Sequence, residues 1–167
     1  MPRHGRPSLR QTWVMRGEVR RYEEKDRQAV LDLAPRLMEG VARWRSPDGV
    51  RAAVTGWVVE AVGRAAEPGR FVYVAEVDGV VAGFVSGEQR THWSGDQELY
   101  VGELVVSTSH EGEGVGRALI DTVTDHARRL GVTTITLDTG AANTSARGFY
   151  RSLGFEEEDV KLTRVLS

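Results

Sequence analysis

Three glycines recur at every second position in the stretch SHEGEGVGRAL, residues 109–119. An apolar run precedes them and an amphipathic pattern follows, which predicts a strand leading into a helix. The N–H groups in the first turn of a helix have no internal partners and carry a partial positive charge, so they favour an anion. Gly112, Gly114 and Gly116 place no side chain between these groups and a ligand. We interpret residues 112–118 as a backbone cradle for a phosphate or pyrophosphate.

Other interpretations of this stretch differ in how well they fit. A Walker A loop needs Lys-Ser or Lys-Thr after its last glycine, and neither follows Gly116. A dinucleotide fingerprint, G-x-G-x-x-G, would need glycine where Arg117 or Leu119 stands, although Asp138 ends the next predicted strand where a ribose-binding acid would lie. The glycines could also build nothing more than a tight turn.

The elements that position this stretch are predicted from hydrophobic periodicity and turn residues. In chain order they are a strand at 18–22, a helix from Asp26 that Pro35 kinks or delays, a helix at 50–65, two strands joined by Asp78-Gly79, a strand at 98–106, a helix at 115–130, a strand at 132–138, a helix capped by Asn143 and ended by Gly154, and a last strand near 160–166. A strand, a crossover helix and a strand form a right-handed parallel unit, so the sheet changes from antiparallel to parallel at residues 98–106. With helices on both faces, this is a mixed α/β fold.

Composition indicates one ordinary globular domain, with 167 residues, 40% apolar and 28% charged. No apolar run approaches the ~20 residues of a membrane span and no secretory signal is present, so we expect a cytoplasmic protein without membrane partners. Cysteine is absent and the four histidines have no metal-ligand spacing. We therefore expect no metal and no cysteine acyl-enzyme.

Charge is distributed unevenly along the chain. Residues 1–21 hold six Arg and one Glu and so carry +5, which leaves −7 on the remainder because the total is −2. We interpret residues 1–17 as a basic, flexible extension and residues 18–167 as a single domain. The acidic body argues against nucleic acid as a partner.

Two motifs resemble the GNAT superfamily of N-acetyltransferases. ELYVGELVVSTSHEGEGVGRALIDTV is similar to its fourth strand and Q/R-x-x-G-x-G/A loop, and TLDTGAANTSARGFYRSLGF is similar to its Asn…Phe-Tyr…Leu-Gly-Phe helix. The resemblance covers residues 18–166. It implies a three-layer αβα sandwich splayed between the fourth and fifth strands, acetyl-coenzyme A (acetyl-CoA) as donor and an amine as acceptor.

The resemblance also assigns roles by matching position. The pyrophosphate would be held by Glu111, Gly112, Glu113, Gly114, Val115, Gly116, Arg117 and Ala118. Leu104, Val105 and Val106 would offer backbone groups to the pantetheine arm and the thioester carbonyl. Asn143 would contact the same arm, and Tyr150 would lie at the cofactor and act as general acid. Where the family has Arg or Gln, this chain has Glu111, whose charge, with that of Glu113, should repel pyrophosphate unless Arg117 offsets it.

Glu103 is the candidate general base. An alkylammonium group has a pKa of about 10, so it must lose a proton before its nitrogen can attack a thioester. Glu103 lies in an otherwise apolar strand, where burial would raise its pKa towards the useful range. It could equally be a structural acid, with a water relayed from Glu98 or a backbone carbonyl in its place. Without cysteine, direct transfer is favoured over a covalent acyl-enzyme.

We expect the acceptor to be a primary amine of a small molecule or peptide, and the sequence does not identify it further. Residues 38–57 and the loop with His92, Trp93 and Asp96 are expected to frame it. Two other functions stay open, a non-catalytic sensor that binds acyl-CoA and a nucleotide-binding oxidoreductase. A homodimer is also open, since the edge of the last strand, KLTRVL, could pair across one.

Overall fold

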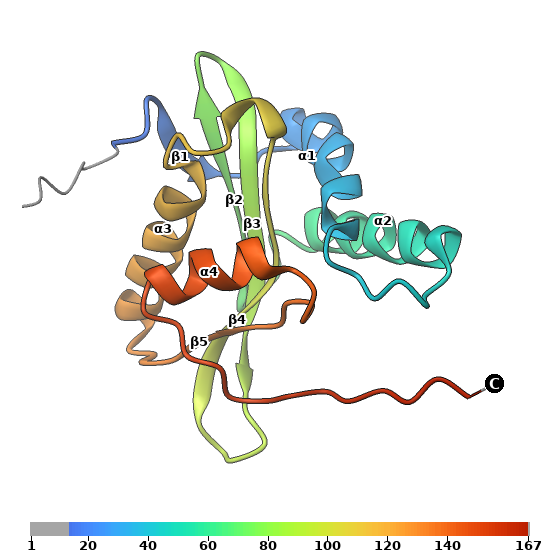
Figure 1. Ribbon diagram of the computed structural model, residues 1–167. Coiled ribbons are helices and arrows are strands. Elements are labelled where there is room, and N and C mark those ends of the chain that lie inside the picture. Colours follow the sequence, from blue (N-terminus) through green and yellow to red (C-terminus); the bar gives the residue numbers. More distant parts are fainter. Residues whose placement is uncertain (1–13, 167) are drawn as a thin grey trace, which may run out of the picture.

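A five-stranded sheet forms the centre of the computed structural model, which describes residues 14–166 (Figure 1). The strands lie side by side in chain order: β1 (Glu18–Arg21), β2 (Arg70–Val77), β3 (Val80–Thr91), β4 (Gln97–Val106) and β5 (Ile135–Leu137). The first four are antiparallel, whereas β5 runs parallel to β4. The predicted change of direction at residues 98–106 is confirmed.

Helices cover both faces of the sheet (Figure 1). They are η1 (Glu24–Asp26), α1 (Arg27–Leu33), η2 (Ala34–Met38), α2 (Pro47–Gly63), η3 (Thr108–His110), α3 (Val115–Leu130) and α4 (Thr144–Ser152), where η marks a 3-10 helix. Leu119 and Val123 of α3 pack into the core on one face, and Val30 of α1 and Val58 of α2 pack against Phe84 on the other. The three-layer mixed fold is thereby confirmed. Within residues 14–166, no helix is both long enough and apolar enough to cross a bilayer.

The sheet opens between β4 and β5. Although β4 has 10 residues, only Leu99–Val101 pair with β5. On the other side of β4, Ser86 pairs with Glu103 and Gly87 with Val101, so Gly102 is the extra residue of a β-bulge. The predicted splay between the fourth and fifth strands is confirmed.

Two predicted elements differ from the structure. The helix from Asp26 is α-helical only to Leu33 and then tightens into η2, because Pro35 lacks an N–H and its ring crowds the preceding turn. The last predicted strand, 160–166, is wrong for the single chain, which forms no ladder there. The segment runs away from the domain (Figure 1), and alternating apolar residues do not make a strand without an edge to pair with.

The predicted N-terminal extension falls largely outside the described residues, since residues 1–13 are not described. Met15 packs against the core, and Gly17 adopts φ +134° with its position for a Cβ only 2.0 Å from the Glu76 carbonyl oxygen. Met15 and Gly17 therefore belong to the packed part of the described chain.

Arg20 ties β1 to the first helical turn and to β2. Its guanidinium donates to the two carboxylate oxygens of Asp26 at 2.7 and 2.8 Å and to Glu76 at 2.6 Å. Asp26 is buried and also accepts from the Glu23 N–H at 2.9 Å. The hydrogen bonds from Arg20, and then that from Glu23, hold the pKa of Asp26 below its usual value.

Replacing Asp26 with Asn should lower the free energy of unfolding by about 2 kcal/mol at neutral pH, because it removes a charged acceptor from Arg20. A carboxylate with a lowered pKa stabilises the fold above its unfolded-state pKa and loses that contribution as the pH falls through the folded value. In urea unfolding, the gap between wild type and Asp26→Asn should therefore be full at neutral pH and shrink below about pH 4. A gap that does not change with pH would contradict this account.

Candidate functional site

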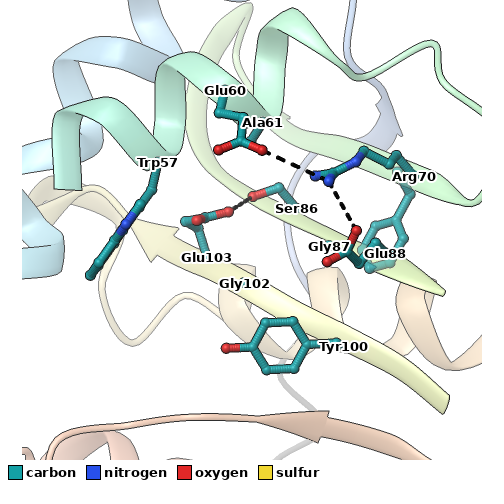
Figure 2. A pocket seen from close by; sticks show the side chains of 11 residues that line it. Trp57, Glu60, Ala61, Arg70, Ser86, Gly87, Glu88, Tyr100, Gly102 and Glu103 are labelled. Carbon is teal, nitrogen blue, oxygen red and sulfur yellow. Dashed lines mark hydrogen bonds and ion pairs between the residues drawn. The ribbon is translucent and has the colours of Figure 1, made fainter. Parts of the chain in front are cut away.

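A cavity of roughly 170 Å³ lies between α2 and the middle of the sheet, beside the bulge (Figure 2). Its wall is formed by Trp57, Glu60, Ala61, Arg70, Phe71, Ser86, Gly87, Glu88, Tyr100, Gly102 and Glu103. Three of these residues carry carboxylates and one carries a guanidinium. The cavity is therefore an acidic hollow with an aromatic rim.

Glu103, the predicted base, points into this cavity from β4 (Figure 2). The buried hydroxyl of Ser86 on β3 donates to Glu103 Oε2 at 2.5 Å. Burial raises the pKa of Glu103; the hydrogen bond from Ser86 acts against this rise, and the charge of Glu60 adds to it. A carboxylate with a raised pKa can both take up and release a proton closer to neutral pH.

The other charged groups of the cavity are largely paired with one another. Arg70 contacts Glu88 at 3.0 Å and Glu60 at 3.8 Å (Figure 2). The Tyr100 hydroxyl donates to Asp138 at 2.9 Å. Burial, and to a lesser extent this hydrogen bond, raises the pKa of Tyr100 to about 12. Glu103 differs from the other carboxylates of the cavity wall in that its hydrogen-bond donor is a neutral hydroxyl, whereas Glu60 and Glu88 contact Arg70.

Backbone groups of β4 face the opening of the sheet. The Ser107 N–H donates to the Ala82 carbonyl at 2.8 Å, and in an antiparallel ladder successive residues alternate between facing the partner strand and facing away. Val105 therefore directs its N–H and C=O to β3, whereas Leu104 and Val106 direct theirs into the splay. Of the three predicted strand residues, the structure brings the backbone of Leu104 and Val106 to the opening and places Val105 in the core.

The glycine stretch has the geometry of an open cradle. Gly112 and Gly114 adopt φ +76° and +82°, and no side chain caps the first turn of α3. The first helical hydrogen bond runs from the Ala118 N–H to the Gly114 carbonyl at 3.0 Å. The N–H groups at 115–117 therefore have no intrahelical partners. Packing also favours glycine at position 116, because a Cβ there would lie 3.1 Å from the ring of Phe149 on α4.

Glu111, at the start of this loop, forms an ion pair with Arg36 of η2. Arg36 also contacts Glu39 at 2.5 Å. Arg36 and Glu111 are 75 positions apart in the sequence. From the sequence, only the nearby Arg117 could be proposed as a compensating cation. The charge of Glu111 is therefore balanced by a cation of η2.

Asn143 and Tyr150 come from α4. Asn143 Oδ1 caps the helix by accepting from the Ala146 N–H at 3.1 Å, and its Nδ2 donates to the Glu39 carbonyl at 3.5 Å. A methyl group on Gly40 would lie 2.3 Å from Asn143 Cβ, so the chain after η2 touches α4. Burial raises the pKa of Tyr150 to about 12, which keeps its hydroxyl protonated at neutral pH.

Only part of the predicted acceptor frame lines the cavity. Trp57 of α2 lies at its edge, and also borders a more apolar hollow of roughly 290 Å³ along α2 that includes Val41, Val50 and Val54. The loop with His92, Trp93 and Asp96 joins β3 to β4 and lines neither hollow, and Trp93 is 87% exposed. Ser86 and Glu60, which the sequence did not single out, complete the wall.

Comparisons with known proteins agree with this geometry. The model of the acetyltransferase (GNAT) family matches residues 36–155, well over half of the chain. N-acetyltransferase 8 of Rattus norvegicus is 33% identical over 96 residues, 57% of this chain and 43% of that protein. The chain therefore spans less than half the length of that curated relative.

Two solved structures share the fold. Aminoglycoside N-acetyltransferase AAC(6')-Iy in complex with CoA matches with a TM-score of 0.69 and 21% identity, over 91% of this chain and 96% of that chain. Glucosamine-6-phosphate N-acetyltransferase of Arabidopsis thaliana matches with a TM-score of 0.63 and 16% identity, over 90% of this chain and 98% of that chain.

Replacing Ser86 with Ala should raise the pKa of Glu103 further, because the O–H donor that stabilises the carboxylate is lost. A carboxyl-detected NMR titration measures this directly. Ser94→Ala is the matched control, since that hydroxyl contacts only His92 and Asp96 in the exposed loop. A Glu103 pKa that is unchanged or lower in Ser86→Ala would show that the hydroxyl does not stabilise the charge.

Proposed function

Because this chain belongs to the GNAT acetyltransferase family, we propose that it transfers the acetyl group of acetyl-CoA directly to a primary amine of a small molecule or peptide. The observation that carries the proposal is Glu103, a half-buried carboxylate of raised pKa that faces a cavity beside the splayed strands. The match to a CoA-bound acetyltransferase fold supports the choice of donor. The family match sets aside the nucleotide-binding oxidoreductase.

The donor would lie along unpaired backbone groups. Its diphosphate fits the uncapped N–H groups at 115–117, where nothing lies within 4 Å of a Cβ position on Gly112. Its pantetheine arm fits the splay, where the N–H and C=O groups of Leu104 and Val106 are free of β3. Asn143 would turn its Nδ2 from the long contact with Glu39 to the same arm.

Glu103 would act on the acceptor. The ammonium group of the acceptor gives a proton to the carboxylate, and the neutral nitrogen then attacks the thioester carbon. The carbon–nitrogen bond forms as the carbon–sulfur bond breaks. Backbone N–H groups at the opening would stabilise the negative charge that develops on the carbonyl oxygen.

Tyr150 would protonate the departing sulfur. With a pKa of about 12 its hydroxyl is fully protonated at neutral pH, and so is available as a donor. The products are an amide and the free thiol of CoA. The nitrogen loses its second proton as the amide forms, and this proton restores the Tyr150 hydroxyl. Glu103 returns the first proton to solvent, so that the reaction releases one proton overall.

The cavity suits a cationic acceptor. Glu60, Glu88 and Glu103 outnumber Arg70 on its wall, and the exposed ring of Trp57 can stack on a cation or an apolar group. The apolar hollow on the other side of Trp57 could hold the remainder of the acceptor.

Incubation with acetyl-CoA and a library of primary amines should release free thiol, which a thiol reagent detects without background because the protein has no cysteine.

Glu103→Gln should lower kcat by about 10²-fold at neutral pH, with recovery at high pH where more acceptor is already unprotonated. Tyr150→Phe should lower kcat with little change in the Kd for acetyl-CoA. Thermal stabilisation by acetyl-CoA without thiol release from any amine would indicate a sensor instead.

Glu111→Gln should tighten acetyl-CoA binding by about two- to fivefold, because it removes a negative charge from the cradle and frees Arg36 for the diphosphate. Glu113→Gln is the matched control, which removes a charge but leaves the pair of Arg36 and Glu111 intact, and should have a smaller effect. Calorimetry at two salt concentrations should show the gain falling as salt rises. An equal gain for S-acetyl-pantetheine, which has no diphosphate, would contradict the assignment.

A further inference from the structure

Trp57 lines both the cavity at Glu103 and the apolar hollow along α2, so the two adjoin at this residue. Its side chain descends from α2 next to Glu103 (Figure 2), and about half of the residue is exposed. Core packing therefore does not seal the passage between the two spaces. A molecule with its nitrogen at Glu103 can extend past Trp57 into the hollow.

The α2 side of the hollow is apolar. Val50, Ala53 and Val54 line it together with Trp57, and their spacing of three and four residues places them on one face of the helix. Val54 is buried in the core, whereas Val50 and Ala53 are only partly covered. An apolar group in the hollow would remove this surface from water, which is favourable.

The hollow and the cavity also differ in charge. The cavity wall carries Glu60, Glu88 and Glu103, whereas the wall of the hollow has no acidic residue and includes Arg45. Residues 41–59 hold three Arg and one Asp and so carry +2, in a chain whose net charge is −2. In the part of the chain that the structure describes, Arg45 has no ion-pair partner. A second ammonium group in the hollow would therefore lose water without gaining a carboxylate.

The distances along α2 set the length of a molecule that fills both spaces. Ala53 and Glu60 are seven positions apart, which is about 10 Å along the helix axis. Arg45 lies farther still, just before the first turn of α2. A free α-amino acid, whose nitrogen and carboxylate are attached to one carbon, is too short to reach from Glu103 to Arg45.

We propose that the acceptor is an amphipathic amine. Its ammonium group lies at Glu103, an apolar group about 10 Å away lies in the hollow beyond Trp57, and a carboxylate at its far end contacts Arg45. This inference rests on the proposed acetyl transfer and narrows its acceptor. Polycations, whose charge suits the cavity, are disfavoured by the hollow. Small molecules and peptides can both have this order of groups.

Three acceptors of similar length test the order of groups. They are 6-phenylhexylamine, the same amine with a carboxylate at the para position of its ring, and octane-1,8-diamine. In the thiol-release assay, kcat/KM should be about tenfold higher for the phenyl compound than for the diamine, because the ring is buried. The carboxylate should raise it a further two- to fivefold, as an estimate for an exposed ion pair. A diamine that reacts as well as the phenyl compound would overturn the proposal.

Ala53→Glu tests the hollow directly, since it places a carboxylate on the apolar wall. The preference for 6-phenylhexylamine over the diamine should fall by about tenfold. Ala52→Glu is the matched control, because Ala52 is exposed on the same helix and lines neither space, and should keep the preference. Circular dichroism checks that both variants are folded. An equal loss of preference in the two variants would show a general effect of charge and contradict the assignment.

Arg45→Glu tests the far end of the acceptor. The advantage of the para-carboxylate over the unsubstituted ring should disappear or reverse. Arg43→Glu is the matched control, because Arg43 is exposed two positions earlier and lines neither space, and should retain the advantage. If Arg45→Glu retains it as well, the anionic end does not lie at Arg45.

Peptides distinguish the two sources of such an amine. An extended chain covers about 10 Å in three residues, so Ala-Gly-Leu-Glu places Leu in the hollow when its N-terminal amine lies at Glu103. It should exceed Ala-Gly-Lys-Lys in kcat/KM by about tenfold. A peptide acceptor is indicated if Ala-Gly-Leu-Glu also exceeds the para-carboxylate compound, and a small-molecule acceptor if it does not.

Calorimetry with CoA-saturated protein separates this inference from the proposed function. It measures binding of 6-phenylhexylamine and of the diamine without turnover. If no amine gives free thiol while the phenyl compound still binds about tenfold more tightly, acetyl transfer is refuted and the amphipathic site stands. If thiol is released but the diamine binds and reacts better, acetyl transfer stands and the amphipathic acceptor is refuted.

Discussion

The unmade hydrogen bonds of the splayed sheet are the constraint on which the rest of this structure depends. Buried N–H and C=O groups must find partners, yet β5 pairs with only three residues of a much longer β4. The backbone of Leu104 and Val106 and the uncapped turn of α3 therefore converge on one opening. In the proposed function, the amide-bearing pantetheine arm and the diphosphate of acyl-CoA would provide partners for these two sets of groups.

The bulge at Gly102 places the Glu103 side chain in the cavity beside this opening. The extra residue shifts the register of β4, so that Glu103 pairs with Ser86 and points towards α2, while its neighbours keep their backbone turned to the splay. One strand thus serves two surfaces. The Glu103 side chain lies in the hollow under α2, and the peptide groups of Leu104 and Val106 face the splay.

The sequence predicted those parts of the site that are local in the chain. The glycine stretch, the hairpin at Asp78-Gly79 and the odd carboxylate in an apolar strand each follow from spacing within a few residues. Ser86 and Arg36 could not be found that way, because their roles arise only when β3 lies beside β4 and η2 lies beside the loop at Glu111. The prediction of a strand at 160–166 was wrong for a related reason. A strand needs a neighbouring strand to pair with, and the alternation of apolar and polar residues does not show where that neighbour lies.

The contact between η2 and α4 spans the opening from one rim to the other. A methyl group on Gly140 would lie 2.3 Å from the Gly40 carbonyl oxygen, and Asn143 reaches the Glu39 carbonyl from the same turn. These glycines bring the two rims into backbone contact, in the manner of a clasp. A molecule that occupied the splay would lie next to this clasp, so its release would be coupled to the loosening of the clasp.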